Sequence, residues 1–179
     1  MKAMTFRPTD FFIPRRYPVF AGIISLSLLC GAWFFQYALG YPPCQMCYWQ
    51  RHAHKLIIGV AIFAIIMTRF VQPNASEKAR FWTYLIISSF LISAALAFWH
   101  MGVEYKWWEG PKTCSGTPHL GALTGTDLLD SLDEKIRPPA CNEIVWSLLG
   151  LSMAGWNMVI SLCGCFLGLL SLKTRHDQG

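Results

Sequence analysis

The sequence predicts an all-α integral membrane protein: a bundle of four transmembrane helices with a long outward loop before the last helix. Three observations support this fold class. Of the 179 residues, 54% are hydrophobic, only 14% are charged, and the charges fall between long apolar runs. An average soluble domain carries about 25% charged residues, and a disordered chain combines low hydrophobicity with high net charge. Both classes are therefore excluded, and residues 1–179 are expected to form a single membrane domain.

The first two expected helices are 18–39 and 53–71. The first lies in a stretch, residues 17–50, that holds no charged side chain. A hydrocarbon core of about 30 Å needs about 20 apolar residues, so this run is long enough to cross it. The second has only 13 uncharged residues between Lys55 and Arg69. It crosses the membrane only if both of these cations extend to the interface.

The last two expected helices are 81–103 and 146–172. In the first of these, His100 is the one side chain that titrates near neutral pH, and it stands near the outward end. The second lies within 29 residues, 144–172, that carry no formal charge. Ionisable residues inside a membrane segment are functional candidates by default, which marks His100 for attention.

The distribution of charge between the loops predicts the orientation. Nine Lys/Arg and only three acidic residues lie in the N-terminal arm (1–17), the segment 69–80 and the tail after 172. The segment 104–143 holds four Lys/Arg and seven acidic residues. The positive-inside rule therefore places both termini in the cytoplasm and the loop 104–145 on the outer, periplasmic side. The expected environment is a lipid bilayer. A nucleic-acid partner is not expected, because the basic residues do not form one cluster.

This topology divides the seven cysteines into two groups. The three within the expected spans are interpreted as small apolar core residues: Cys30, Cys163 and Cys165. The four on the outward side are an even number in an oxidising compartment, which indicates disulfides: Cys44, Cys47, Cys114 and Cys141. The same four thiolates could hold zinc. However, Cys114 and Cys141 are 27 residues apart and do not form the second short-spaced pair that such zinc sites usually have.

The Cys-x-x-Cys motif formed by Cys44 and Cys47 favours redox chemistry. Two prolines precede it, and proline is preferred in the first turn of a helix, so Cys47 is expected near a positive helix end. Arg51 follows one turn later on the same face, and a nearby cation stabilises a thiolate. Haem attachment is disfavoured because Tyr48 stands where that motif requires histidine. A b-type haem held by His54 and His100 is a further alternative, but no second inward histidine pair exists.

Taken together, these features resemble the bacterial disulfide bond formation protein B (DsbB) family. The resemblance covers nearly the whole chain. It rests on four spans, the segment Pro-Cys-Gln-Met-Cys-Tyr-Trp-Gln-Arg (43–51), His100 near the end of the third span, and two lone cysteines in the last outward loop. The family is located in the bacterial inner membrane. The resemblance implies that this protein oxidises a periplasmic thioredoxin-like dithiol protein (DsbA-like) and passes the electrons to ubiquinone or menaquinone, with no metal required.

The resemblance also implies a role for each matching residue. Cys44 and Cys47 would be the quinone-linked pair, with Cys47 facing the quinone ring. Arg51 would hold the quinone and favour the Cys47 thiolate, and His100 would stand beside the quinone. Cys114 would accept the partner's thiolate in a mixed disulfide, with Cys141 as its companion.

Three alternatives remain open from the residues. One is a DsbB-like paralogue that serves a dedicated substrate. Another is an enzyme similar to vitamin K epoxide reductase, although in that family the Cys-x-x-Cys usually comes late in the chain rather than first, as here. The third is a non-enzymatic membrane protein whose four outward cysteines form structural disulfides or a metal site.

Overall fold

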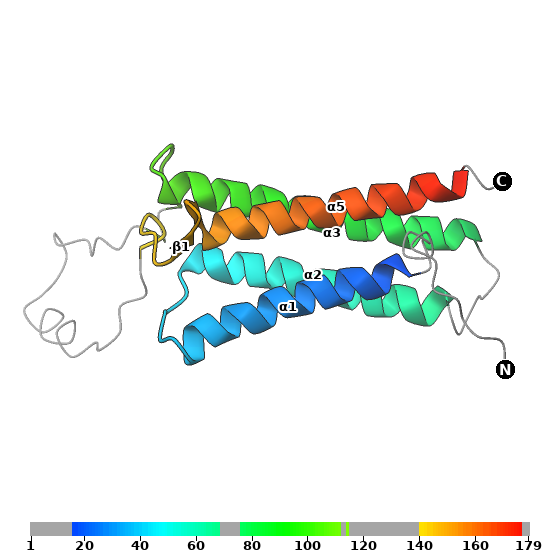
Figure 1. Cartoon of the computed structure of the whole chain (residues 1–179), viewed down its shortest axis with the longest axis horizontal. Helices are drawn as coiled ribbons and strands as arrows, with labels where there is room; N and C mark the ends of the chain where they lie inside the picture. Colours follow the sequence, from blue (N-terminus) through cyan, green and yellow to red (C-terminus); the bar gives the residue numbers. More distant parts are fainter. Residues whose placement is uncertain (1–15, 69–75, 112–113, 115–139, 177–179) are drawn as a thin grey trace, which may run out of the picture.

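The computed structural model describes residues 16–68, 76–111, 114 and 140–176. The N-terminal arm before residue 16, the segment 69–75 and most of the outward loop, 115–139, lie outside this part of the chain. The described residues form four long helices and one short hairpin (Figure 1). The elements are α1 (Tyr17–Tyr37), α2 (Gln45–Ile66), α3 (Ser76–Glu104), β1 (Ser147–Leu148), β2 (Leu151–Ser152) and α5 (Met153–His176).

The helices form an antiparallel bundle. The first residues of α1, the last residues of α2 and α5, and the first residues of α3 lie at one end, while the hairpin and the start of α2 lie at the other (Figure 1). Helix α3 packs most extensively on α5 and also on α2, which in turn packs on α1. The start of α1 and the end of α5 are thus on the same side of the bundle (Figure 1).

Three of the described helices are long and apolar enough to cross a membrane: Tyr17–Tyr37, Lys78–Glu104 and Met153–Lys173. Helix α2 is as long as α1 but does not join them, because its first half carries charged and polar side chains. It begins at Gln45, eight residues before the expected span 53–71, and the last residues of that span lie outside the described part of the chain.

The centre of the bundle is packed through small residues. Ala61 and Ala64 of α2 are fully buried beside Phe90 of α3. A Cβ added at Gly164 of α5 would lie 2.9 Å from the Phe90 ring, and one at Gly168 would lie 2.5 Å from Ile87, so these glycines let α5 approach α3 closely. Small residues at such contacts are typical of helix packing in membranes.

The three cysteines within the helices differ in their surroundings. Cys165 is buried in the bundle, as expected of a core residue, and its thiol lies 3.6 Å from the Ile87 carbonyl oxygen. Cys30 and Cys163 are exposed on the surface of the bundle instead. The prediction that all three are core residues is therefore wrong for two of them, since each helix has an outer face that the sequence does not mark.

The last helix begins later than the expected 146–172, because residues 147–152 form a hairpin. Its two-residue turn has Leu149 at φ 53° and Gly150 at φ 80°, the positive angles that a type I′ turn requires. Tyr105, the residue after α3, donates a hydrogen bond to the Gly150 carbonyl at 2.6 Å. The hydroxyl of Ser152 accepts the Gly155 N–H at 3.1 Å and so caps the N-terminus of α5. The helix therefore starts at Met153, and the hairpin is a small exception to the all-α class.

Candidate active site

The Cys-x-x-Cys motif forms the N-terminus of α2. Cys44 is the N-cap residue, with extended backbone (φ −78°, ψ 172°), and its Sγ accepts the backbone N–H of Cys47 at 3.2 Å. Pro42 and Pro43 immediately before it have no N–H to continue a helix backwards, so α2 starts here. The two sulfurs are free and lie 2.9 Å apart. The structure thus starts α2 directly after the prolines, and the sulfur that caps the helix is that of Cys44.

His100 of α3 faces the same sulfur. Its Nε2 lies 3.4 Å from Cys44 Sγ, and the ligand atoms of Cys44, Cys47 and His100 all lie within 4.8 Å of one another. Glu104, one turn further along α3, places Oε1 3.9 Å from the same Nε2 and accepts a hydrogen bond from Ser152. The dithiol, the imidazole and the carboxyl group thus form one compact cluster at the hairpin end of the bundle.

These contacts stabilise a thiolate at Cys44. The hydrogen bond with Cys47 and the neighbouring imidazole of His100 lower the pKa of Cys44 from 9.0 to about 4, against the opposing effect of burial. The N-terminal position on α2 acts in the same direction, since a helix N-terminus favours negative charge. The sequence argument expected the stabilised thiolate at Cys47, whereas the described donors converge on Cys44.

Arg51 points toward α1. Its Nη1 donates to Gln36 Oε1 at 2.5 Å and its Nη2 donates to the Ala32 carbonyl at 3.1 Å. The guanidinium carbon also lies 5.5 Å from the centre of the Tyr48 ring. In the described part of the chain, the hydrogen bonds of Arg51 therefore go to α1, and Tyr48 lies against its guanidinium. The sequence argument expected Arg51 beside Cys47 as a cation that favours the thiolate.

The outer pair, Cys114 and Cys141, forms a disulfide. This pairing contradicts the alternative of a four-thiolate zinc site, because two of the four sulfurs are bonded to each other. The disulfide packs into one buried cluster with Cys44, Met46 and Val103. Both cysteine pairs, which are 67 to 97 residues apart in sequence, therefore share a single buried contact region.

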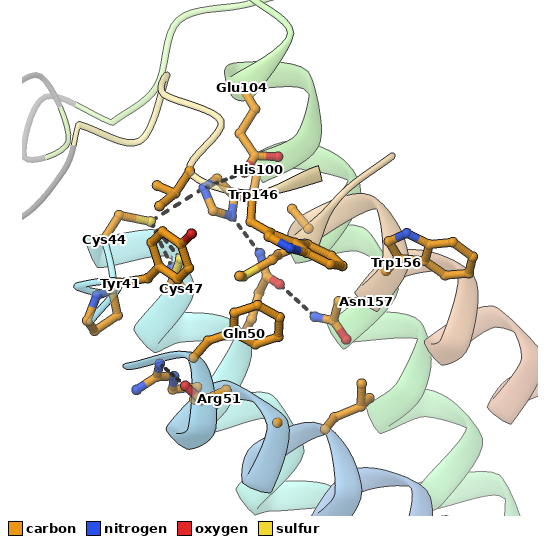
Figure 2. Close-up of a pocket in the computed structure, with 18 of the residues that line it drawn as sticks. Tyr41, Cys44, Cys47, Gln50, Arg51, His100, Glu104, Trp146, Trp156 and Asn157 are labelled. Carbon is orange, nitrogen blue, oxygen red and sulfur yellow. Dashed lines mark hydrogen bonds and ion pairs between the residues drawn. The ribbon is translucent and has the colours of Figure 1, made fainter. Parts of the chain in front are cut away.

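A cavity of about 380 Å³ opens beside the inner pair (Figure 2). Its polar edge is formed by both sulfurs and by side chains from α2, α3 and α5: Cys44, Cys47, Gln50, Arg51, His54, His100, Glu104 and Asn157. Its remaining walls are largely apolar and include Leu28, Leu29, Phe35, Val145, Trp146, Leu148, Met153, Trp156 and Ile160. A cleft of this size, with apolar walls and few convergent polar groups, is typical of a small-molecule site.

Several polar residues of this site were not predicted from the sequence. The Gln50 amide lies 2.7 Å from His100 Nδ1, and Asn157 donates to Gln50 Oε1 at 2.6 Å. On the other side of His100, Glu104 accepts a hydrogen bond from Ser152. Asn157 could have been noticed, because it is a polar amide in a long apolar run. Gln50 offered no comparable signal, since it lies in a segment that is polar throughout.

Comparison with known proteins gives consistent matches. A family model described as "Disulfide bond formation protein DsbB" matches residues 14–171. A "Disulfide bond formation protein B" of Haemophilus influenzae is 32% identical over 162 residues, 86% of each chain. One from Verminephrobacter eiseniae is 28% identical over 163 residues, covering 89% of this chain and 84% of the relative. No solved structure matches. The chain therefore belongs to the DsbB family of disulfide bond formation proteins.

Proposed function

We propose that this protein is a thiol:quinone oxidoreductase of the bacterial inner membrane. In this role it would form disulfides and reoxidise a periplasmic thioredoxin-like dithiol protein (DsbA-like). The observation that carries the proposal is the arrangement of the two cysteine pairs. A disulfide, Cys114–Cys141, packs against a dithiol, Cys44 and Cys47, and that dithiol borders an apolar cavity. The relatives named disulfide bond formation protein B support the same activity.

The outer pair would receive electrons from the partner. A thiolate of the reduced partner attacks Cys114 Sγ, which breaks the Cys114–Cys141 bond and leaves Cys141 as a thiolate. The partner's second thiol then displaces Cys114, so the partner leaves with a disulfide and the outer pair is reduced. Cys114 is the more accessible of the two, with 7% of its surface exposed against 1% for Cys141, which supports its role as the attacked sulfur.

The inner pair would then take the same two electrons. A thiolate of the outer pair attacks the Cys44–Cys47 disulfide, and the outer disulfide closes as both inner thiols form. An outer disulfide beside an inner dithiol, as in this structure, corresponds to the stage after that transfer. The donors around Cys44 stabilise the reduced inner pair, which makes its disulfide a better oxidant for the outer pair.

The cavity fits a quinone head group. It is large enough for a substituted ring, its walls are largely apolar and include aromatic side chains, and hydrogen-bonding side chains stand next to the sulfurs. Arg51, Gln50 and His100 would contact the ring oxygens from this polar edge. Bound ubiquinone or menaquinone would supply the oxidising power, accepting two electrons and two protons as the Cys44–Cys47 disulfide forms.

Helix α2 is proposed as the fourth membrane span. Two of its polar side chains, Gln50 and His54, are buried against other helices and do not face the surroundings. Beyond Lys55 its exposed side chains are apolar: Leu56, Ile62, Phe63 and Ile66. Four crossings would place both termini in the cytoplasm and the cysteine pairs at the periplasmic face, as the charge distribution predicts.

A direct test follows quinone absorbance in detergent-solubilised protein. On addition of a reduced thioredoxin-like dithiol protein and a soluble ubiquinone analogue, we expect thiol-dependent loss of quinone. Cys47→Ser should abolish this loss, while the matched change Cys163→Ser, at an exposed position on α5, should leave it intact. A menaquinone analogue measured in parallel shows which quinone is preferred.

The outcomes separate the alternatives. Quinone loss with one dithiol protein but not with a general thioredoxin-like substrate would indicate a paralogue with a dedicated partner. No loss with any dithiol, from protein whose cysteines are oxidised at the start, would refute the oxidase and favour a structural role for the disulfide.

A further inference from the structure

A chain of hydrogen bonds runs from Cys44 into the middle of the bundle. It passes through His100 on α3, Gln50 on α2, Asn157 on α5 and His54 on α2 (Figure 2 shows its first four members). The successive distances are 3.4 Å from Cys44 Sγ to His100 Nε2, 2.7 Å from His100 Nδ1 to Gln50 Nε2, 2.6 Å from Gln50 Oε1 to Asn157 Nδ2, and 2.7 Å from Asn157 Oδ1 to His54 Nε2.

The chain has a direction. An amide nitrogen only donates and an amide oxygen only accepts. Asn157 Nδ2 donates to Gln50 Oε1, so Gln50 must present its N–H groups to His100. His100 Nδ1 therefore accepts, and the proton of the neutral imidazole must be on Nε2, the atom that faces Cys44 Sγ.

The contacts at the inner end of the chain agree with this direction. An amide oxygen only accepts, so His54 Nε2 is the donor in its 2.7 Å contact with Asn157 Oδ1, and the Ser161 hydroxyl lies 3.3 Å from the same oxygen and 3.1 Å from Ser93 Oγ. In this orientation the Asn157 oxygen faces the His54 ring and the Ser161 hydroxyl, and its NH2 group faces Gln50. Ser25 lies 3.3 Å from His54 Nδ1 and holds the other side of that ring.

Burial makes these contacts costly to break. His54 and His100 are each 3% exposed, and Gln50 and Asn157 are each 8% exposed. A buried polar group that loses its partner is destabilised, because no water is there to replace the lost hydrogen bond, so each member keeps its neighbour oriented. The titratable groups that face His100 among the described residues are Cys44 and Cys47 at the start of α2 and Glu104 on its own helix.

We propose that His54, Asn157 and Gln50 are positioning residues that hold His100 in the tautomer whose Nε2–H points at Cys44. The bundle interior would thus set the proton donor of the redox site through three helix-to-helix contacts, from His54 to Asn157, from Asn157 to Gln50 and from Gln50 to His100. This inference deepens the proposed function, because it concerns the same site. Its tests use neither quinone nor a partner protein, so failure of the oxidase assay and failure of this proposal are distinguishable.

The tautomer is measured by 15N NMR of histidine-labelled, reduced protein in detergent micelles. His100 should show a protonated Nε2 and an unprotonated Nδ1 near neutral pH. In Asn157→Leu and Gln50→Leu the signals should move toward a mixture of tautomers. Thr83→Val is the matched control, since it removes a fully buried hydroxyl whose hydrogen bond goes to Ala79 of the same helix, α3.

A nearly isosteric variant covers the case in which the leucine variants do not fold. In Gln50→Glu a carboxylate accepts from both Asn157 and His100, so both nitrogens of His100 should become protonated. Rates of Cys44 alkylation supply a second readout, with a roughly tenfold loss at acidic pH expected in Gln50→Leu, corresponding to one pKa unit.

The proposal is overturned if Asn157→Leu and Gln50→Leu fold, keep the parent His100 signals and keep the parent alkylation profile. It is equally overturned if Gln50→Glu leaves Nδ1 of His100 unprotonated. In either case the chain would only join the helices and would not orient the histidine.

Discussion

Replacing His100 by phenylalanine should raise the pH at which Cys44 becomes a reactive thiolate. An aromatic ring is retained, but the Nε2–H that faces Cys44 Sγ at 3.4 Å is lost. Cys44 keeps its other two partners, the backbone N–H of Cys47 at 3.2 Å and the Cys47 sulfur at 2.9 Å. The change therefore removes one donor of three and leaves the position of Cys44 at the start of α2 unaltered.

The size of the effect follows from that single hydrogen bond. A hydrogen bond to a charged group contributes about 1.5–3 kcal/mol, and one pKa unit corresponds to about 1.36 kcal/mol. The pKa of Cys44, held at about 4, should therefore rise by about one to two units in His100→Phe. At pH 5 the thiolate fraction would fall roughly two- to tenfold, and at pH 8 it would not change.

The assay is the rate of alkylation of reduced protein by iodoacetamide between pH 4 and 9, with peptide mass spectrometry to separate Cys44 from Cys47. His52→Phe is the matched control, because His52 is on α2 but exposed. An alkylation profile of Cys44 that is the same in His100→Phe as in the parent would refute the assigned role of His100. Equal shifts in both variants would refute it as well.

Three further predictions concern stability. Ser152→Ala removes the cap of α5 and the donor to Glu104, and should lower the free energy of unfolding by about 1–2 kcal/mol in thermal or denaturant melts, whereas exposed Ser147→Ala should not. Gly102→Ala would place a Cβ 2.0 Å from the Trp108 ring and should lower the free energy of unfolding by about 1–3 kcal/mol. Gly59→Ala is the control, because nothing lies within 4 Å of a Cβ there. Unchanged melting of Gly102→Ala would contradict this packing. Because the pKa of Cys44 is lower in the folded state, its thiolate stabilises reduced protein fully above pH 9 and progressively less toward pH 4. The stability of reduced relative to oxidised protein should therefore decline over that range, and a constant difference would refute the thiolate.

Most of the helical architecture could be predicted because membrane spans are long and uniformly apolar. Helix α1 occupies Tyr17–Tyr37 against an expected 18–39, and α3 extends beyond 81–103 at its start. The start of α5 could not be placed, because the residues before it are as apolar as the helix itself. There the hairpin is stabilised by tertiary contacts, such as Tyr105 with the Gly150 carbonyl, that hydropathy does not report.

The candidate site was predicted in its parts but not in its connections. The Cys-x-x-Cys motif and His100 carry local signals, and the structure brings them within hydrogen-bond distance. Which sulfur the donors favour depends on the capping geometry of Cys44, which spacing alone does not determine. The partners of Arg51 and the role of Asn157 depend on which faces α1 and α5 turn toward α2, and these are set by packing.

The most direct test of the central claim is a single turnover without any partner protein. Cys114→Ser/Cys141→Ser protein is fully reduced, mixed anaerobically with a ubiquinone analogue, and examined for quinone loss and for the disulfide formed. The account predicts loss of one quinone for each Cys44–Cys47 disulfide that appears. Persistence of both the quinone and the Cys44 and Cys47 thiols would contradict it.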